Sequence, residues 1–194
     1  MSNTILFIDG ENFIYKIKEA LKEKKIKKNA YDLAVIDFNR LFENSLSGFT
    51  ISRKIFYAAK LHIHPGTAKK SEELIKFQRK LRNNLVKCGY EFIIAGNVRA
   101  QKVGDKIIFK EKGVDVRIAV DLVSLACDKK LDQAILCSSD SDLQPAIREI
   151  SKRNIETIYL GFEANPNKGL TYTTNKTILF RNSEIVDCIR KSAQ

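Results

Sequence analysis

The chain has 194 residues, of which 44% are apolar and 29% are charged, with 9 Gly and 3 Pro. These values are typical of globular proteins and exclude a disordered, collagen-like or solenoid chain. No apolar run approaches the roughly 20 residues that cross a bilayer, and the first residues lack the features of a signal peptide. The four scattered cysteines form no CxxC pair, so we expect reduced thiols in a cytoplasmic protein and no structural zinc.

The net charge of +11 is unevenly distributed along the chain. Residues 1–112 hold 23 basic and 12 acidic residues, whereas residues 113–194 hold 11 of each. The basic surplus is densest between Arg53 and Lys112. Such a field attracts polyanions, so we expect nucleic acid as the partner, although basic runs are often only solvated surface. A membrane-binding helix would carry large apolar anchors, and residues 16–28 contain no Trp, so no membrane contact is expected.

Strands and helices are expected to alternate along the first half of the chain. Short apolar runs predict buried strands, and apolar residues at helical spacing predict helices. Ser71-Glu72-Glu73 is typical of a capping box, which would start a helix there. The elements predicted in this half are a strand at Thr4–Ile8, a helix from Phe13 to Leu21, a helix at Asp37–Ser45, a strand at Ile51–Ala59 and a helix at Ser71–Cys88.

The second half continues the alternation. The region Arg99–Lys110 is predicted to be a hairpin or a basic loop. The segment Val114–Lys130 is apolar on most sides and predicts a largely buried helix. The other elements predicted are strands at Tyr90–Ala95, Asp132–Cys137, Glu156–Leu160 and Thr177–Phe180, a helix at Leu143–Lys152, a polar loop from Asn165 and a final helix from about Ser183. Uniformly apolar strands between helices favour one α/β domain with a mainly parallel sheet covered on both faces.

Acidic residues stand where predicted strands end and helices begin. Asp9 closes the first strand, Asp140 and Asp142 follow the Asp132–Cys137 strand, and Asp115 opens the predicted buried helix. In an open α/β sheet these junctions gather at one edge, so three or four carboxylates should converge there. Such a cluster needs a cation or a proton, and hard oxygen ligands favour Mg²⁺ or Mn²⁺.

The alternative interpretation is structural. Asp and Ser after a strand are ordinary helix N-caps, and Asp115 is also favourable near a helix N-terminus. His62 and His64 alternate at a strand end and could ligate a metal, but exposed loop histidines are much more common. The signatures of serine hydrolases, P-loop NTPases and dinucleotide enzymes are absent from the sequence.

Three segments resemble the NYN domain, in the LabA-like branch of the PIN-like nuclease superfamily. They are ILFIDGENF at Ile5–Phe13, KEKGVDVRIAVDLVSLA at Lys110–Ala126 and AILCSSDSDLQPAI at Ala134–Ile147. The resemblance implies a PIN-like, Rossmann-like three-layer sandwich, with the NYN domain at residues 1–163 and a C-terminal extension at residues 164–194 packed on it. The glycine usual between the positions of Ser138 and Asp140 is a serine here.

The resemblance also implies an activity: a divalent-metal-dependent ribonuclease that leaves a 5′-phosphate and a 3′-hydroxyl. It places Asp9, Asp115, Asp140 and Asp142 in the metal-binding and catalytic set, with Asn12 and Ser138 beside them. Asp121 matches a further acidic position, which could reach a second metal or instead pair with a buried arginine. The basic residues expected to grip phosphates are Lys112, Arg99, Lys102, Lys106 and Lys110.

Two other functions remain open at this point. A nucleic-acid-binding or protein-interaction module could keep the same fold without turnover. A small-molecule phosphohydrolase would explain the acids but not the basic excess. RNA is the expected substrate, with DNA as the alternative, and both a monomer and a homodimer are open.

Overall fold

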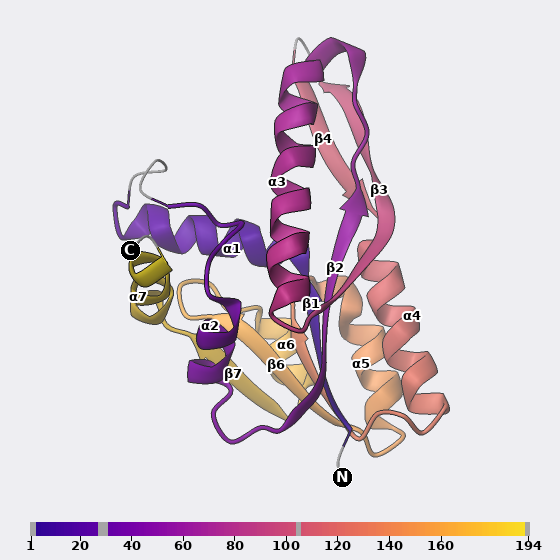
Figure 1. Ribbon diagram of the computed structural model, residues 1–194. Coiled ribbons are helices and arrows are strands. Elements are labelled where there is room, and N and C mark those ends of the chain that lie inside the picture. Colours follow the sequence, from indigo (N-terminus) through magenta and orange to yellow (C-terminus); the bar gives the residue numbers. More distant parts are fainter. Residues whose placement is uncertain (1–2, 27–30, 104–105, 193–194) are drawn as a thin grey trace.

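One seven-stranded sheet forms the centre of the molecule (Figure 1). The description rests on a computed structural model and covers residues 3–26, 31–103 and 106–192, with all side chains except those of 100–107 and 190–192. The strand order is β4-β3-β2-β1-β5-β6-β7, and every neighbouring pair is parallel except the antiparallel β3–β4. The strands are β1 (Thr4–Asp9), β2 (Ile51–Lys60), β3 (Glu91–Val103), β4 (Lys106–Lys112), β5 (Gln133–Cys137), β6 (Glu156–Phe162) and β7 (Lys176–Phe180).

Helices cover both faces of this sheet, which gives three layers. One face carries α1 (Gly10–Glu23), α2 (Phe38–Ser45), α3 (Ala68–Lys87) and α7 (Asn182–Ser192); the other carries α4 (Val114–Cys127), α5 (Gln144–Ser151) and α6 (Lys168–Thr173). Two short 3₁₀ helices, η2 (Pro65–Thr67) and η3 (Ser141–Leu143), precede α3 and α5. The α/β three-layer sandwich with a mainly parallel sheet is therefore confirmed.

The first strand is the central one. β1 lies between β2 and β5, and all six of its residues are buried. Leu6 and Ile8 pack into the layer that contains α1, whereas Ile5 and Phe7 pack into the layer that contains α4. Because both faces of the strand are covered, its sequence is a continuous apolar run without alternation.

The predicted hairpin is present and extends beyond the rest of the sheet. β3 and β4 pair antiparallel from Asn97 opposite Lys112 to Val103 opposite Lys106. In Figure 1 this hairpin rises together with α3 as an arm above the other strands. The loop alternative for Arg99–Lys110 is therefore wrong.

Two predictions about helices need correction. Ser71 does not cap α3, which begins at Ala68; its hydroxyl lies buried inside the helix and donates to the Thr67 carbonyl at 3.0 Å. α4 is not largely buried, because only Val114, Ile118, Leu122 and Ala126 among its residues are fully buried. Its outer face stays apolar and open, with Val116 60% exposed.

The tail joins the sheet. β7 pairs with β6 along its length, and the polar loop predicted from Asn165 contains the short helix α6. A division of the chain between residues 163 and 164 remains a prediction. Among the described residues, no helix combines the length and the apolar character that a membrane span needs.

Candidate metal and nucleic-acid site

The carboxyl ends of β1 and β5 place polar side chains at one edge of the sheet. The strands are parallel neighbours, with Ile8 beside Cys137, so Asp9 and Ser138 leave the sheet next to each other. The Ser138 hydroxyl donates to Asp9 Oδ2 at 3.0 Å, which ties the two strand ends together.

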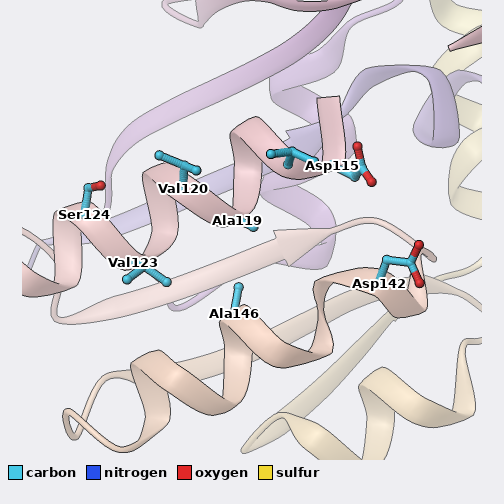
Figure 2. A pocket seen from close by; sticks show the side chains of 8 residues that line it. Asp115, Ala119, Val120, Val123, Ser124, Asp142 and Ala146 are labelled. Atoms are coloured by element: carbon cyan, nitrogen blue, oxygen red, sulfur yellow. The ribbon is translucent and has the colours of Figure 1, made fainter. Parts of the chain in front are cut away.

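Three aspartates from separate elements meet at this edge. Asp115 in the first turn of α4, Asp140 after β5 and Asp142 in η3 can each offer a carboxylate oxygen within 4.8 Å of the other two. Figure 2 shows Asp115 and Asp142 at the neighbouring ends of their helices. Two unit charges at that separation repel by about 3 kcal/mol at an effective dielectric near 20. The arrangement therefore favours a bound cation.

Asp9 lies beside this triad and is more deeply buried. Its Oδ1 accepts from the Asn12 backbone N–H at 3.2 Å, and its exposed fraction is 7%. Burial raises the pKa of Asp9 from 3.8 to about 6; the hydrogen bonds from Asn12 and Ser138 lower it, and the nearby charge of Asp140 raises it. The carboxylate is thus mainly ionised at neutral pH.

The capping interpretation holds for two of the four aspartates. Asp9 caps α1, and Asp140 caps η3 through the bond from the Asp142 backbone N–H to its Oδ1 at 2.9 Å. Asp115 makes no cap, because Gly113 occupies the N-cap position of α4. Capping orients Asp140 and leaves its second oxygen for another partner.

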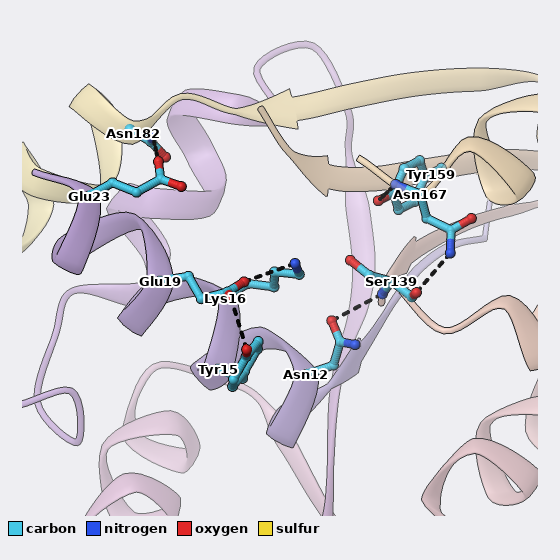
Figure 3. A network of polar contacts seen from close by, with 9 residues as sticks. All are labelled: Asn12, Tyr15, Lys16, Glu19, Glu23, Ser139, Tyr159, Asn167 and Asn182. Carbon is cyan, nitrogen blue, oxygen red and sulfur yellow. Dashed lines mark hydrogen bonds and ion pairs between the residues drawn. The ribbon is translucent and has the colours of Figure 1, made fainter. Parts of the chain in front are cut away.

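The loop after β5 is held from two sides. Asn12 Oδ1 accepts from the Ser139 backbone N–H at 3.0 Å. Asn167, just before α6, donates through its amide nitrogen to the Ser139 carbonyl at 2.8 Å (Figure 3). The same nitrogen donates to Ser141 Oγ at 2.9 Å. The tail thus contacts the loop that carries Asp140. The sequence predictions do not include Asn167. Asn is a preferred N-cap residue, which signals the start of α6 but not the contact with the Ser139 loop.

The four aspartates and Asn12 line a common cleft, which we call the acidic cleft. It has a volume of about 710 Å³ and is lined from three segments, namely residues 9–15, 109–116 and 140–142. Two further acids, Glu11 and Glu111, belong to its walls and were not predicted as site residues. Burial raises the pKa of Glu111 to about 9, supported by its hydrogen bond with Glu11. This pair therefore binds a proton more tightly than an isolated glutamate does.

The predicted phosphate-binding residues lie on the hairpin. Lys110 and Lys112 line the acidic cleft, and exposed Arg99 lies opposite Lys110 in the β3–β4 register. The side chains of Lys102 and Lys106 lie outside the described residues. Basic groups therefore border the acids on the hairpin side of the cleft.

Two weaker candidates have other partners. Asp121 accepts from the Tyr57 hydroxyl at 2.9 Å and pairs with Arg117 Nε at 2.9 Å, so its metal role stays a prediction without support from these contacts. His62 is exposed and its Nε2 lies 3.5 Å from Asn97 Oδ1. Neither His62 nor His64 belongs to the three-carboxylate group.

An apolar groove of about 560 Å³ runs from the triad along α4 and α5 (Figure 2). Val116, Val120 and Ala146 line it, and Asp115 and Asp142 stand at one end. The open apolar face of α4 therefore continues directly from the acidic edge.

The donor set fits a hard divalent cation. Carboxylate oxygens are the ligands that Mg²⁺ and Mn²⁺ prefer. Among the described residues, no salt bridge engages Asp9, Asp115, Asp140 or Asp142, so none of the described lysines and arginines is paired with the cluster.

Comparisons with known proteins agree with this fold. A solved structure of a protein of unknown function from Vibrio parahaemolyticus is similar to the chain, with a TM-score of 0.62 and 19% identity over 92% of each chain, which supports the fold alone. No curated protein matches the sequence at a significant level. The family model of the NYN domain matches residues 3–180, which include every element from β1 to β7. The chain therefore belongs to the NYN domain family.

Proposed function

We propose that the protein is a divalent-metal-dependent ribonuclease of the LabA-like branch. NYN domains belong to the PIN-like nuclease superfamily, and the observation that carries the proposal is the meeting of Asp115, Asp140 and Asp142 within 4.8 Å. A basic hairpin borders these acids, as a polyanionic substrate requires.

Asp115, Asp140 and Asp142 would hold Mg²⁺ or Mn²⁺, with Asp9 alongside. When bound, such an ion supplies positive charge that polarises a phosphodiester and makes a water more acidic. Asn12 and Ser138 keep the strand ends and the Ser139 loop in place around the acids. Lys110 and Lys112 would neutralise the flanking phosphates of the strand.

The test is cleavage of end-labelled single-stranded RNA and DNA by the purified protein with Mn²⁺ or Mg²⁺, and with EDTA. We expect Asp140→Asn to retain the fold, because an amide oxygen can still accept from the Asp142 backbone N–H, but to reduce cleavage at least 10- to 100-fold. The matched control is Asp128→Asn, which removes one negative charge from an exposed site at the far end of α4.

Full activity of Asp140→Asn would contradict the assigned role. RNA binding without any metal-dependent cleavage would favour the non-catalytic binding module. Turnover of p-nitrophenyl phosphate in preference to RNA would favour a small-molecule phosphohydrolase.

A further inference from the structure

One aromatic side chain in the acidic cleft is left open to solvent. Tyr15, in the second turn of α1, lines the cleft and is 57% exposed. The other ring in the cleft wall, Phe109, is half-buried, and the Lys70 ammonium lies 5.3 Å from its centroid. Tyr15 therefore offers the more accessible aromatic surface there.

The ring of Tyr15 is held in one orientation. Its hydroxyl donates to Glu19 Oε1 at 2.9 Å, and Lys16 Nζ pairs with Glu19 Oε2 at 3.0 Å (Figure 3). The ring consequently lies along the helix surface. This hydrogen bond restricts the side chain, which reduces the entropy that a planar ligand stacking on the ring would cost.

Tyr15 also stands at a defined position relative to the acids. Asn12 precedes it by three residues and therefore lies on the same side of α1, where its amide oxygen contacts the Ser139 backbone N–H. The ring is thus about one helical turn from the loop that carries Asp140. A chain bound at the triad passes within reach of it.

The charges around Tyr15 select which part of a nucleotide can lie there. Glu11 and Glu19 flank the ring on α1. Lys16 Nζ lies 5.9 Å from the ring centroid but is paired with Glu19, so these three side chains together carry one negative charge, which repels phosphates. The lysines that attract phosphates, Lys110 and Lys112, are on the hairpin side of the cleft. An uncharged base is therefore the part of the polymer suited to the Tyr15 side.

We propose that Tyr15 is a stacking residue for an unpaired base of the nucleic acid that occupies the acidic cleft. The inference rests on the proposed nucleic-acid substrate and adds a specificity-determining residue to it. Only a base whose face is not covered by neighbours in a duplex can stack on a side chain, so the subsite requires a single strand at this point.

The experiment uses the lack of tryptophan in this chain. Tyr15→Trp places one indole in the cleft, and Tyr172→Trp places one on α6 at a tyrosine that is 88% exposed and does not line the cleft. Each variant is titrated in EDTA, which prevents hydrolysis, with single-stranded RNA, the same RNA as a duplex, and an abasic strand of equal charge. We expect saturable quenching only for Tyr15→Trp with single-stranded RNA.

Affinities of three further variants complete the test. Tyr15→Ala should weaken binding of single-stranded RNA about 5- to 100-fold and leave abasic binding unchanged. Tyr15→Phe should keep most of the affinity, and Tyr172→Ala should match the wild type. The proposal is overturned if Tyr15→Ala weakens binding of the intact and the abasic single strand equally, or weakens neither. It is also overturned if the fluorescence of Tyr15→Trp is not quenched, or if no strand binds. If the strands bind in this pattern but are not cleaved, the nuclease proposal fails and the stacking role stands. If the wild type and Tyr15→Ala cleave RNA equally well, the stacking role fails and the nuclease proposal stands.

Discussion

The charge of Asp9 is set by its burial. Its pKa is raised from 3.8 to about 6, mainly by desolvation. The folded state therefore holds this proton more tightly than the unfolded chain, so in the metal-free protein the contribution of Asp9 to stability falls as the pH rises from about 4 to about 6. Above about pH 6, the buried charge of Asp9 lowers the free energy of unfolding by at most about 3 kcal/mol.

Replacing Asp9 by Asn should remove this cost. An amide can still accept from the Asn12 backbone N–H and can donate to Ser138, so both hydrogen bonds have a counterpart. In EDTA we expect Asp9→Asn to be more stable than the wild type by about 1–3 kcal/mol at pH 8 and nearly equal to it at pH 4. Urea unfolding followed by circular dichroism at both pH values measures this; an equal gain at both would show that ionisation is not the cause.

Asn167 both caps α6 and donates to the loop after β5, and one substitution can separate these two contacts. Asn167→Ser keeps a side-chain oxygen able to cap α6 but removes the amide that donates to Ser139 and Ser141. We expect stability to change by less than about 1 kcal/mol. If Asn167 positions the triad, cleavage should fall about 10-fold, as for outer partners of metal ligands. Unchanged cleavage would confine Asn167 to capping.

At the scale of elements, the corner between β4 and α4 depends on close backbone contact. Gly96 of β3 has φ +69, and a Cβ there would lie 2.2 Å from the Lys112 carbonyl oxygen. Gly113, which caps α4, packs against the Cα of Gly96. This contact sets where α4 begins, and hence where Asp115 stands.

Two alanine substitutions test this corner. Gly89 also has a positive φ, but its Cβ would meet nothing within 4 Å. Both Gly89→Ala and Gly96→Ala incur the strain of the left-handed conformation, about 1–2 kcal/mol. Gly96→Ala should cost about 1–3 kcal/mol more, because the backbone around Lys112 must move. Urea unfolding of both variants gives the difference, and equal costs would rule out the close contact as the reason for glycine.

Elements are predictable from the sequence where local pattern and tertiary surroundings agree. The apolar runs of β1 and β5 become buried strands, and Asp9, Asp140 and Asp142 after them line one cleft because parallel strands end at one edge. The prediction for α4 is wrong because its outer face is apolar yet lies beside an open groove. The capping box at Ser71 is wrong because η2 starts the helical turn earlier. Glu111 and Asn167 are not predictable from local pattern alone, because hairpin folding and tail packing bring them in from afar.

At the scale of the whole molecule, the uneven charge predicts how binding responds to salt. Each phosphate that a basic side chain neutralises adds about 0.7 to the slope of log affinity against log salt for a single strand. The double variant Arg99→Ala, Lys110→Ala removes two facing hairpin charges, so its slope should be shallower by about 1.4. Lys152→Ala, at the C-terminal end of α5, is the control. Anisotropy of labelled RNA in EDTA over a salt series measures the slopes; an unchanged slope in the double variant would place the phosphates elsewhere.

The central place of β1 has a consequence for biosynthesis. Thr4 hydrogen-bonds to Gln133 of β5, 129 residues later in the chain, so the innermost strand is made long before one of its two neighbours. Contacts between such distant residues form slowly. A ribosome must therefore release most of the chain before Asp9 can meet Asp140. For a nuclease, this order of events would keep the nascent polypeptide harmless to the messenger that encodes it.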